Sequence, residues 1–243
     1  MSKTISEAVI LMAGSGSRLR GADETFLKPL VPILGRPLIS YTLDGLAGAG
    51  IRKVNAVVGF ESERLSAAVA RLIPAGIEIS MIKNLEWRKG NGISLLAAKH
   101  YVTGPFLLTM SDHLFDDATV DLLIESADLN QLNLAVDRKL DSIFDLDDAM
   151  KVQTLGDRVA AIGKNLRAYD AIDVGLFVCP LEIFEYIESA KQGGDCGLVD
   201  GIRLMAADNK VRAINIGEAW WQDVDTPEML QCAEKKLSAP VKS

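Results

Sequence analysis

The residues with the clearest chemical meaning lie near the start of this 243-residue chain. An apolar run over residues 8–12 predicts a buried strand, and the small residues 13–17 after it predict a loop. Backbone N–H groups in such a loop can surround a phosphate, and Arg18 and Lys28 add positive charge beside it. A Gly-Ser stretch alone would indicate no more than a tight turn. With the two cations, it predicts a site for a compact polyanion.

Two common phosphate-binding motifs do not fit this loop. The dinucleotide fingerprint requires a glycine where the chain has Leu19, which excludes a nicotinamide dehydrogenase. A Walker A loop requires Lys and then Ser or Thr after Gly21, where Ala22 and Asp23 stand. The stretch 21–24 between the two cations instead predicts a mobile lid.

Carboxylates form the second candidate group. Asp112 follows the apolar run 106–110, so its side chain is expected at the end of a strand. Asp223 and Asp225 would share one face of an extended segment. Each could be a turn or helix-capping residue, but Mg²⁺ prefers one or two carboxylates with phosphate oxygens and water. The structural roles of these aspartates are compatible with metal binding, and the residues alone do not decide between the two.

Two further features are less specific. The Gly-Asn-Gly turn in residues 84–94 can bring backbone and amide groups close to a nucleobase edge, although in isolation it is a helix start. His113 is expected to be a hydrogen-bonded structural residue, because a substrate phosphate is already ionised near pH 7 and needs no general base. Two histidines and no paired cysteines argue against zinc.

Strands and helices alternate over the first 137 residues and must position these side chains. Strands are predicted at 8–12, 53–58, 78–82, 106–110 and 132–136, with helices from 37 to 48, at 61–73, at 92–101 and at 120–127. This alternation predicts an α/β fold with a doubly wound, mostly parallel, Rossmann-like sheet. Ligands bind at the carboxyl ends of such strands, so residues 13–28, 83–92 and 111–113 should line one edge.

The pattern changes after residue 137. A hairpin is predicted at 151–155 and 158–162, strands at 173–179 and 211–216, and helices at 181–190, 198–207 and 227–237. This half is expected to be a mixed β extension of the same sheet. We therefore predict a single domain over residues 1–237, followed by a tail at 238–243.

The glycine loop also carries a family resemblance. The run Ala13-Gly14-Ser15-Gly16-Ser17-Arg18-Leu19, followed by Lys28-Pro29, resembles the signature of nucleotidyltransferases with a GT-A-like fold, which join an NTP to a phosphorylated small molecule. With residues 84–99, Ser111-Asp112-His113 and 159–177, the chain is similar to the CTP:inositol-1-phosphate cytidylyltransferase family from about residue 8 to residue 236. It departs at Leu27, where the family usually has proline.

The resemblance implies a function and a set of site residues. CTP and a phosphorylated polyol, inositol 1-phosphate above all, would give a CDP-alcohol and pyrophosphate, with Mg²⁺ as cofactor. Arg18 and Lys28 would be catalytic, and Asp112 would bind metal with Asp223 or Asp225. The implied nucleotide-binding residues are Met12, Ala13, Gly14, Ser15, Gly16, Ser17, Asn84, Lys89, Gly90, Asn91 and Ser94. The implied acceptor-binding residues are Lys164, Asp173 and Gly175. The resemblance thus implies a nucleotide-binding half at about residues 1–137 and an acceptor-binding half at about residues 138–237.

Alternatives remain open at this level. The acceptor could be phosphocholine, aminoethylphosphonate or a sugar phosphate, because acceptor pockets vary on one fold. A catalytically silent nucleotide-binding module is a further alternative, although it would not need the complete Arg, Lys and Asp set.

Composition limits the partners. A net charge of −7 argues against nucleic acid and anionic membranes, and no apolar run is long enough to span a bilayer. The start of the chain has no signal-peptide pattern, and three scattered cysteines indicate reduced thiols, so a cytoplasmic location is expected. The expected partners are CTP and a small phosphorylated alcohol, with a homodimer left open. The acidic excess over residues 111–157 is expected to be mostly solvated surface.

Overall fold

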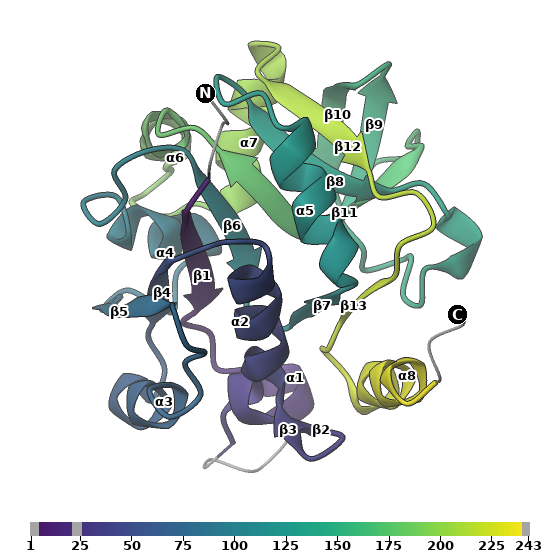
Figure 1. Cartoon of the computed structure of the whole chain (residues 1–243). Helices are drawn as coiled ribbons and strands as arrows, with labels where there is room; N and C mark the ends of the chain where they lie inside the picture. The colour runs from purple at the N-terminus through teal and green to yellow at the C-terminus, as the bar shows by residue number, and fades with distance from the viewer. Residues whose placement is uncertain (1–4, 21–25, 240–243) are drawn as a thin grey trace.

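A nine-stranded sheet forms the centre of the protein in the computed structural model, which describes residues 5–20 and 26–239. The predicted lid at 21–24 and the last residues of the predicted tail, 240–243, lie outside the described residues. The sheet has the order β5-β4-β1-β6-β11-β8-β12-β10-β9 (Figure 1). Its strands are β1 (Glu7–Met12), β4 (Lys53–Val58), β5 (Glu78–Lys83), β6 (Phe106–Met110), β8 (Leu132–Asp137), β9 (Lys151–Leu155), β10 (Arg158–Gly163), β11 (Ala171–Cys179) and β12 (Val211–Asn215).

The predicted mostly parallel sheet is confirmed, with two exceptions in direction. Strands β5, β4, β1 and β6 are parallel neighbours, and Met12 lies in register with Val58. Strand β11 runs antiparallel between β6 and β8, and β10 runs antiparallel to β12 and β9. The second half of the chain therefore enters the middle of the sheet as well as extending its edge.

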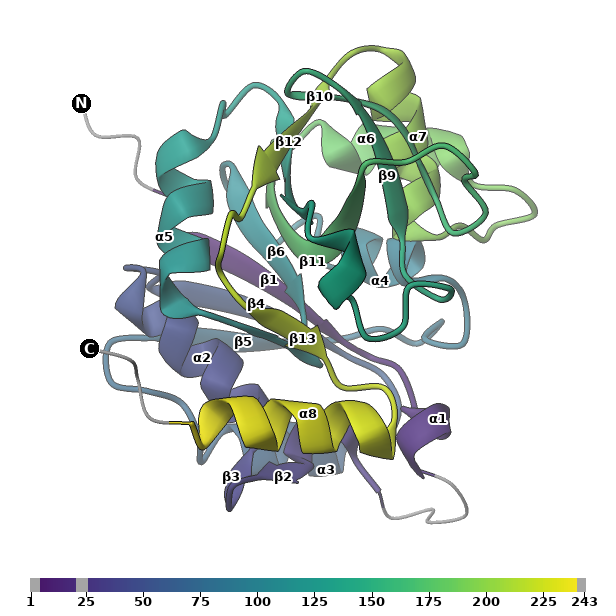
Figure 2. The same cartoon turned by 90° about the vertical axis from the view of Figure 1, so that its right-hand side faces the viewer.

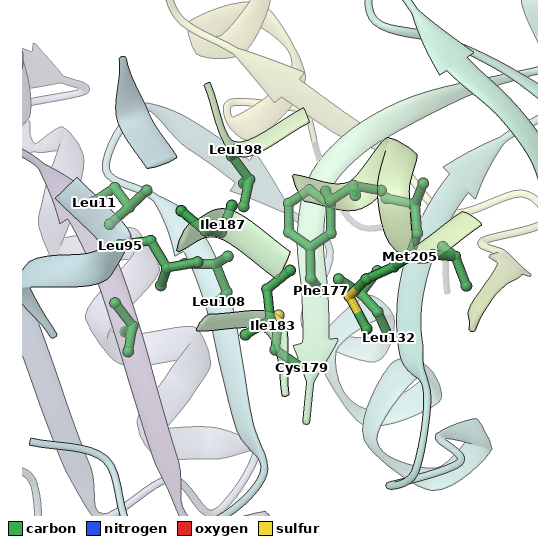
Figure 3. Close-up of a cluster of buried hydrophobic side chains, with 14 of the residues drawn as sticks. Leu11, Leu95, Leu108, Leu132, Phe177, Cys179, Ile183, Ile187, Leu198 and Met205 are labelled. Atoms are coloured by element: carbon green, nitrogen blue, oxygen red, sulfur yellow. The ribbon is translucent and has the colours of Figure 1, made fainter. Parts of the chain in front are cut away.

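Helices cover both faces of the sheet, as a doubly wound fold requires. One face carries α2 (Leu38–Gly48), α3 (Ser62–Val69) and α5 (Asp117–Ser126). The other carries α4 (Asn91–Ala97), α6 (Ile183–Ala190) and α7 (Leu198–Ala207), and Figure 3 shows Phe177 of β11 within the apolar cluster on that side. Each fully buried side chain of this size contributes about 1.5–3 kcal/mol. The predicted helices at 61–73 and 92–101 end early, because residues 71–72 and 98–99 make i→i−3 hydrogen bonds.

Short elements at the carboxyl edge of the sheet were not predicted. They are α1 (Ser17–Arg20), the 3₁₀ turns η1 (Lys28–Leu30) and η2 (Leu140–Ser142), and the paired strands β2 (Pro32–Ile33) with β3 (Arg36–Pro37) and β7 (His113–Phe115) with β13 (Trp221–Asp223). Helix α8 (Pro227–Leu237) lies along this edge with its N-terminal end beside α1, as Figure 2 shows. Its predicted start is confirmed, since the Thr226 hydroxyl accepts a hydrogen bond from the Met229 N–H.

The helices of the described ranges include none that is both long enough and apolar enough to cross a membrane.

Candidate active site

The three loops predicted to share one edge of the sheet do meet there. The Ser111 N–H donates to the Leu11 carbonyl at 3.1 Å, which joins the ends of β6 and β1. The Phe60 N–H donates to the Ala13 carbonyl at 2.9 Å, and the Asn84 N–H donates to the Val58 carbonyl at 2.8 Å. These bonds follow from parallel strands that end at one level.

The glycine loop begins where Met12 and Ala13 are still buried, and Gly14 is exposed. Between described residues, the N–H groups of residues 14–16 donate no hydrogen bond. Gly16 has φ +62°, and a Cβ there would lie 2.6 Å from the Cβ of Lys28. Glycine at position 16 therefore lets the loop close directly over Lys28.

Lys28 is buried beneath this loop between two carboxylates. Its side chain is 9% exposed, and its Nζ lies 2.5 Å from Asp112 Oδ2 while also donating to Asp225 Oδ1. Burial alone would lower the pKa of Lys28, but the charges of Asp112 and Asp225 outweigh it and raise that pKa. Burial likewise opposes ionisation of Asp112, yet His113 and Lys28 bring its pKa well below the usual range. The lysine is a fixed positive charge at the strand ends.

Arg18 links Asp225 to a further aspartate, Asp148, by two ion pairs. Its Nη2 lies 2.5 Å from Asp225 Oδ2, and its Nη1 lies 2.8 Å from Asp148 Oδ2. The other oxygen of Asp148 is 2.5 Å from Lys164 Nζ. The result is an alternating series of acids and bases, here called the charge chain: Asp112, Lys28, Asp225, Arg18, Asp148 and Lys164.

Asp223 lies beside the charge chain and is the third candidate metal ligand, with Asp112 and Asp225. It faces His113 across the β13–β7 pair, and the Gln222 amide donates to its Oδ1 at 3.2 Å. Burial raises the pKa of Asp223 and the His113 charge lowers it, while the carboxylates of Asp225 and Asp112 each raise it. Carboxylate oxygens are the ligands that hard divalent cations prefer, so three neighbouring carboxylates fit such a cation. In the described part of the chain, no three His, Cys, Asp or Glu side chains are already gathered around a metal position.

His113 makes a hydrogen bond, as expected from the sequence. Its Nδ1 lies 2.7 Å from Asp112 Oδ1, so it orients that carboxylate. The ring stacks against Trp221 and Phe115, with centroid distances of 6.2 Å to each. Burial would lower the pKa of His113, but the neighbouring Asp112 charge raises it.

A cavity of about 540 Å³ opens beside the charge chain. Lys164, Asp173 and Gly175 line it from β10–β11, and Trp220 and Trp221 line it from the β13 segment. The Gly175 N–H donates to Asp173 Oδ1 at 2.7 Å within a register shift of β11, and Gly175 has φ +75°. A Cβ at position 175 would lie 2.5 Å from the His113 ring. This bulge directs Asp173 into the cavity wall, and burial raises the pKa of Asp173 to about 6.

Residues 84–94 are held by a hydrogen bond within the segment and by others to residues 194–198. Asn84 Nδ2 donates to Ser94 Oγ at 3.1 Å, and both side chains are buried. Lys89 Nζ donates to the Gly194 carbonyl, and the Gly90 N–H donates to Asp195 Oδ1 at 2.8 Å. Asn91 Oδ1 accepts from the Leu198 N–H, and of the predicted residues in this segment Asn91 lines the cavity.

Comparison with known proteins identifies the fold family. A family model described as the MobA-like NTP transferase domain matches residues 8–143, more than half of the chain. The chain belongs to this family. Nucleotidyltransferases of this kind generally use a divalent metal ion, with nucleotides and sugar phosphates as typical substrates.

Curated relatives of this NTP transferase are longer than the chain. A "Bifunctional IPC transferase and DIPP synthase" of Aquifex aeolicus is 33% identical over 96% of this chain and 52% of its own length. The protein of the same name in Thermococcus kodakarensis is 34% identical over 95% of this chain and 50% of its own length. The chain thus spans about half the length of the curated relatives that it matches.

Solved structures agree with the family assignment. An inositol-1-phosphate CTP transferase from T. maritima superposes with a TM-score of 0.85 at 25% identity, covering 99% of this chain and 100% of that one. A UDP-glucose pyrophosphorylase complexed with UDP-glucose reaches 0.79 at 16% identity, which indicates a shared fold. The predicted α/β nucleotidyltransferase fold and the resemblance to the CTP:inositol-1-phosphate cytidylyltransferase family are confirmed.

In this NTP transferase domain the predicted residues form two groups. Arg18, Lys28 and the three aspartates lie together with the glycine loop, and Lys164 joins them through Asp148. Asn84 and Ser94 form the second group, in which their side chains hydrogen-bond to each other. Sequence reasoning missed Asp148, which lay in an acidic stretch assigned to solvated surface. Its side chain is 44% exposed, yet it binds two predicted site cations. No motif marks it.

Proposed function

We propose that this chain is a cytidylyltransferase that joins CTP to a phosphorylated polyol, with inositol 1-phosphate as the preferred acceptor. The observation that carries the proposal is Lys28, fixed beneath the glycine loop between Asp112 and Asp225, the second of which lines the cavity. A purely binding module has no need of a buried cation at this position. The choice of CTP and inositol 1-phosphate is supported by the likeness to the T. maritima transferase.

The reaction places two polyanions against each other. A phosphate oxygen of the acceptor attacks the α-phosphorus of CTP, a new P–O bond forms, and the bond to the β-phosphate breaks to release pyrophosphate. Fixed cations must offset the charge that develops at the α-phosphoryl group. In the proposal Lys28 does so, while Arg18 and the loop residues 12–17 hold the remaining phosphates. No general base is required, so His113 orients Asp112 rather than moving a proton.

Mg²⁺ is the proposed cofactor, held by Asp112 with Asp223 or Asp225. When bound, it supplies positive charge to the phosphates of the nucleotide. Support comes from the two carboxylates beside Asp223: Asp225 and Asp112 each raise its pKa, against the opposing charges of His113 and Lys28.

The acceptor and base assignments complete the proposal. Lys164 binds the acceptor phosphate, and Asp173 and Gly175 lie beside the acceptor hydroxyls. Asn91 and the backbone of residues 89–90 approach the base, and the Asn84–Ser94 pair supports that turn. Residues 1–137 and 138–237 then act as nucleotide-binding and acceptor-binding halves of one domain, supported by the single sheet that runs through both. A cytoplasmic location, consistent with three free cysteines, belongs to the same proposal.

A pyrophosphate-release screen tests the function. The four NTPs are each combined with inositol 1-phosphate, phosphocholine, aminoethylphosphonate or a hexose phosphate, in the presence of Mg²⁺. We expect the highest turnover for CTP with inositol 1-phosphate. A higher rate with another acceptor would reassign the substrate, and no release with any pair would indicate a silent nucleotide-binding module.

A further inference from the structure

Asp148 is the member of the charge chain with no role in the proposed chemistry, and it occupies a distinctive place. Its carboxylate is shared, with Oδ2 at 2.8 Å from Arg18 Nη1 and Oδ1 at 2.5 Å from Lys164 Nζ. One of these cations comes from the glycine loop and the other from the far side of the cavity. Asp148 thus fills the position where a phosphate oxygen would otherwise meet each of them.

The backbone around Asp148 is fixed on the Lys164 side. Buried Lys151 donates to the carbonyls of Asp147 and Lys164, each at 3.0 Å, and so ties the two segments together. The Ala149 N–H donates to the Asp145 carbonyl at 3.1 Å, which closes the turn that carries Asp148. The contact with Lys164 is therefore built into the fold, whereas the contact with Arg18 spans the cavity.

The pKa of Asp148 also indicates that its contact with Lys164 is the stronger of the two. The hydrogen bond from Lys164 lowers the pKa of Asp148 most, and the hydrogen bond from Arg18 lowers it less. The side chains of Arg18, Asp148 and Lys164 are 56%, 44% and 49% exposed, so each ion pair is weak enough for a phosphate to displace. A carboxylate held by two cations is harder to displace than one held by a single cation.

We propose that Asp148 couples the two substrate sites by holding Arg18 and Lys164 at once in the free enzyme. A nucleotide phosphate that takes Arg18 leaves Asp148 on Lys164 alone, and the acceptor phosphate then competes with one ion pair instead of two. Because coupling between two ligands is reciprocal, a bound acceptor favours the nucleotide equally. Asp148 is a positioning residue rather than a catalytic one. The assignment of the two phosphates rests on the proposed function.

Calorimetry on the full chain with Mg²⁺ tests the coupling. The dissociation constant of inositol 1-phosphate is measured alone and with saturating α,β-methylene-CTP, which cannot transfer its nucleotidyl group. The ratio of the two constants is the coupling factor. Asp148→Asn is expected to lower this factor about two- to fivefold, the range of half-exposed ion pairs, and to tighten inositol 1-phosphate binding in the absence of nucleotide.

Two variants separate coupling from charge and from folding. Asp147→Asn removes the same charge from the neighbouring exposed residue, whose carboxylate pairs with no cation within the described ranges, and its coupling factor should equal that of the wild type. Asp148→Glu keeps a carboxylate and should restore much of the coupling. An unchanged factor in Asp148→Asn, or an equal loss in Asp147→Asn, overturns the proposal.

A second pair of probes makes the result independent of the substrates. If the wild type binds neither the CTP analogue nor inositol 1-phosphate, the proposed function fails. The same cycle is then run with inorganic pyrophosphate and inorganic phosphate. A coupling factor that Asp148→Asn lowers supports the role of Asp148, whereas an unchanged factor, or no binding of either anion, overturns it.

Discussion

Lys28 and Lys164 are the first and last basic residues of the charge chain, and their surroundings differ sharply. Lys28 is 9% exposed beneath a glycine loop and between two carboxylates, whereas Lys164 is 49% exposed and pairs with one half-exposed carboxylate. Exposed ion pairs contribute about 0–1 kcal/mol, while breaking a buried pair typically costs about 3–5 kcal/mol. The Lys28 end is thus preorganised, and the Lys164 end can rearrange.

This difference matches the demands of the proposed reaction. The α-phosphoryl group is the same for every acceptor, so its cation can be fixed in advance at no cost during the reaction. An acceptor must enter and leave through the cavity, and a weakly held cation permits that. The proposal therefore assigns a rigid end, around Lys28, to nucleotidyl transfer and an adaptable end, around Lys164, to acceptor binding.

The largest expected effect tests the rigid end. Lys28→Ala should lower kcat for pyrophosphate release about 10²–10³-fold, because it removes the buried cation beside the reacting phosphate. Asp112→Ala should also remove most turnover. As a control, Lys53→Ala breaks an ion pair with Glu7 at the other end of β1 and should leave kcat unchanged. Full activity in Lys28→Ala, with circular dichroism showing an intact fold, would refute the assignment.

Gly175→Ala tests how tightly the bulge supports His113. The substitution adds a Cβ 2.5 Å from the His113 ring at a positive φ, so the free energy of unfolding should fall by about 2–3 kcal/mol. Gly156→Ala is the matched control, since Gly156 has φ +67° but open space around it, and about 1 kcal/mol is expected there. Urea unfolding measures both, and equal losses would mean that His113 gives way freely.

Lys164→Ala tests the adaptable end. We expect a rise in KM for inositol 1-phosphate of about tenfold with little change in kcat, because a hydrogen bond to a charged group is lost before the transition state. Initial rates at varied acceptor and saturating CTP separate the two constants. A loss of kcat as large as that of Lys28→Ala would erase the contrast between the two ends.

Asp173 gives the most gradual effect, which appears in pH dependence. Its pKa is raised by burial to about 6 in the folded protein, above the ordinary 3.8, so folding favours the protonated form. Its contribution to stability is therefore full below pH about 4 and is lost as pH rises to about 6. Relative to Asp173→Asn, the wild-type free energy of unfolding should fall by about 1 kcal/mol per pH unit across this window. Urea unfolding at several pH values measures the slope, and a difference that does not change with pH would contradict the raised pKa.

The sequence predicted the fold and the meeting of Arg18, Lys28 and Asp112 at one edge of the sheet, because both rest on regular patterns. Apolar runs at 8–12, 53–58 and 106–110 defined the strands, and parallel pairing then brought Arg18, Lys28 and Asp112 to one edge. The predicted alternation also implied helices on both faces, as found.

The parts that sequence reasoning missed have no local pattern. Strands β7 and β13 are three residues long, too short to show periodicity, yet they bring Asp223 opposite His113. Asp148 binds Arg18, 130 positions away in the chain, and only the folded structure brings them together. Whether an amide such as that of Asn84 faces a ligand or a neighbour likewise depends on packing.

The position of β11 affects how the chain can fold while it is being synthesised. This strand pairs with β6 on one side and β8 on the other, although both precede it in the sequence. During synthesis the segment that matches the family model, residues 8–143, therefore emerges with β6 and β8 lacking the strand that joins them. Unpaired edges of this kind invite association with other chains until residues 171–179 arrive. We expect the sheet to close late, in one cooperative step, and a fragment ending at residue 143 to aggregate rather than fold.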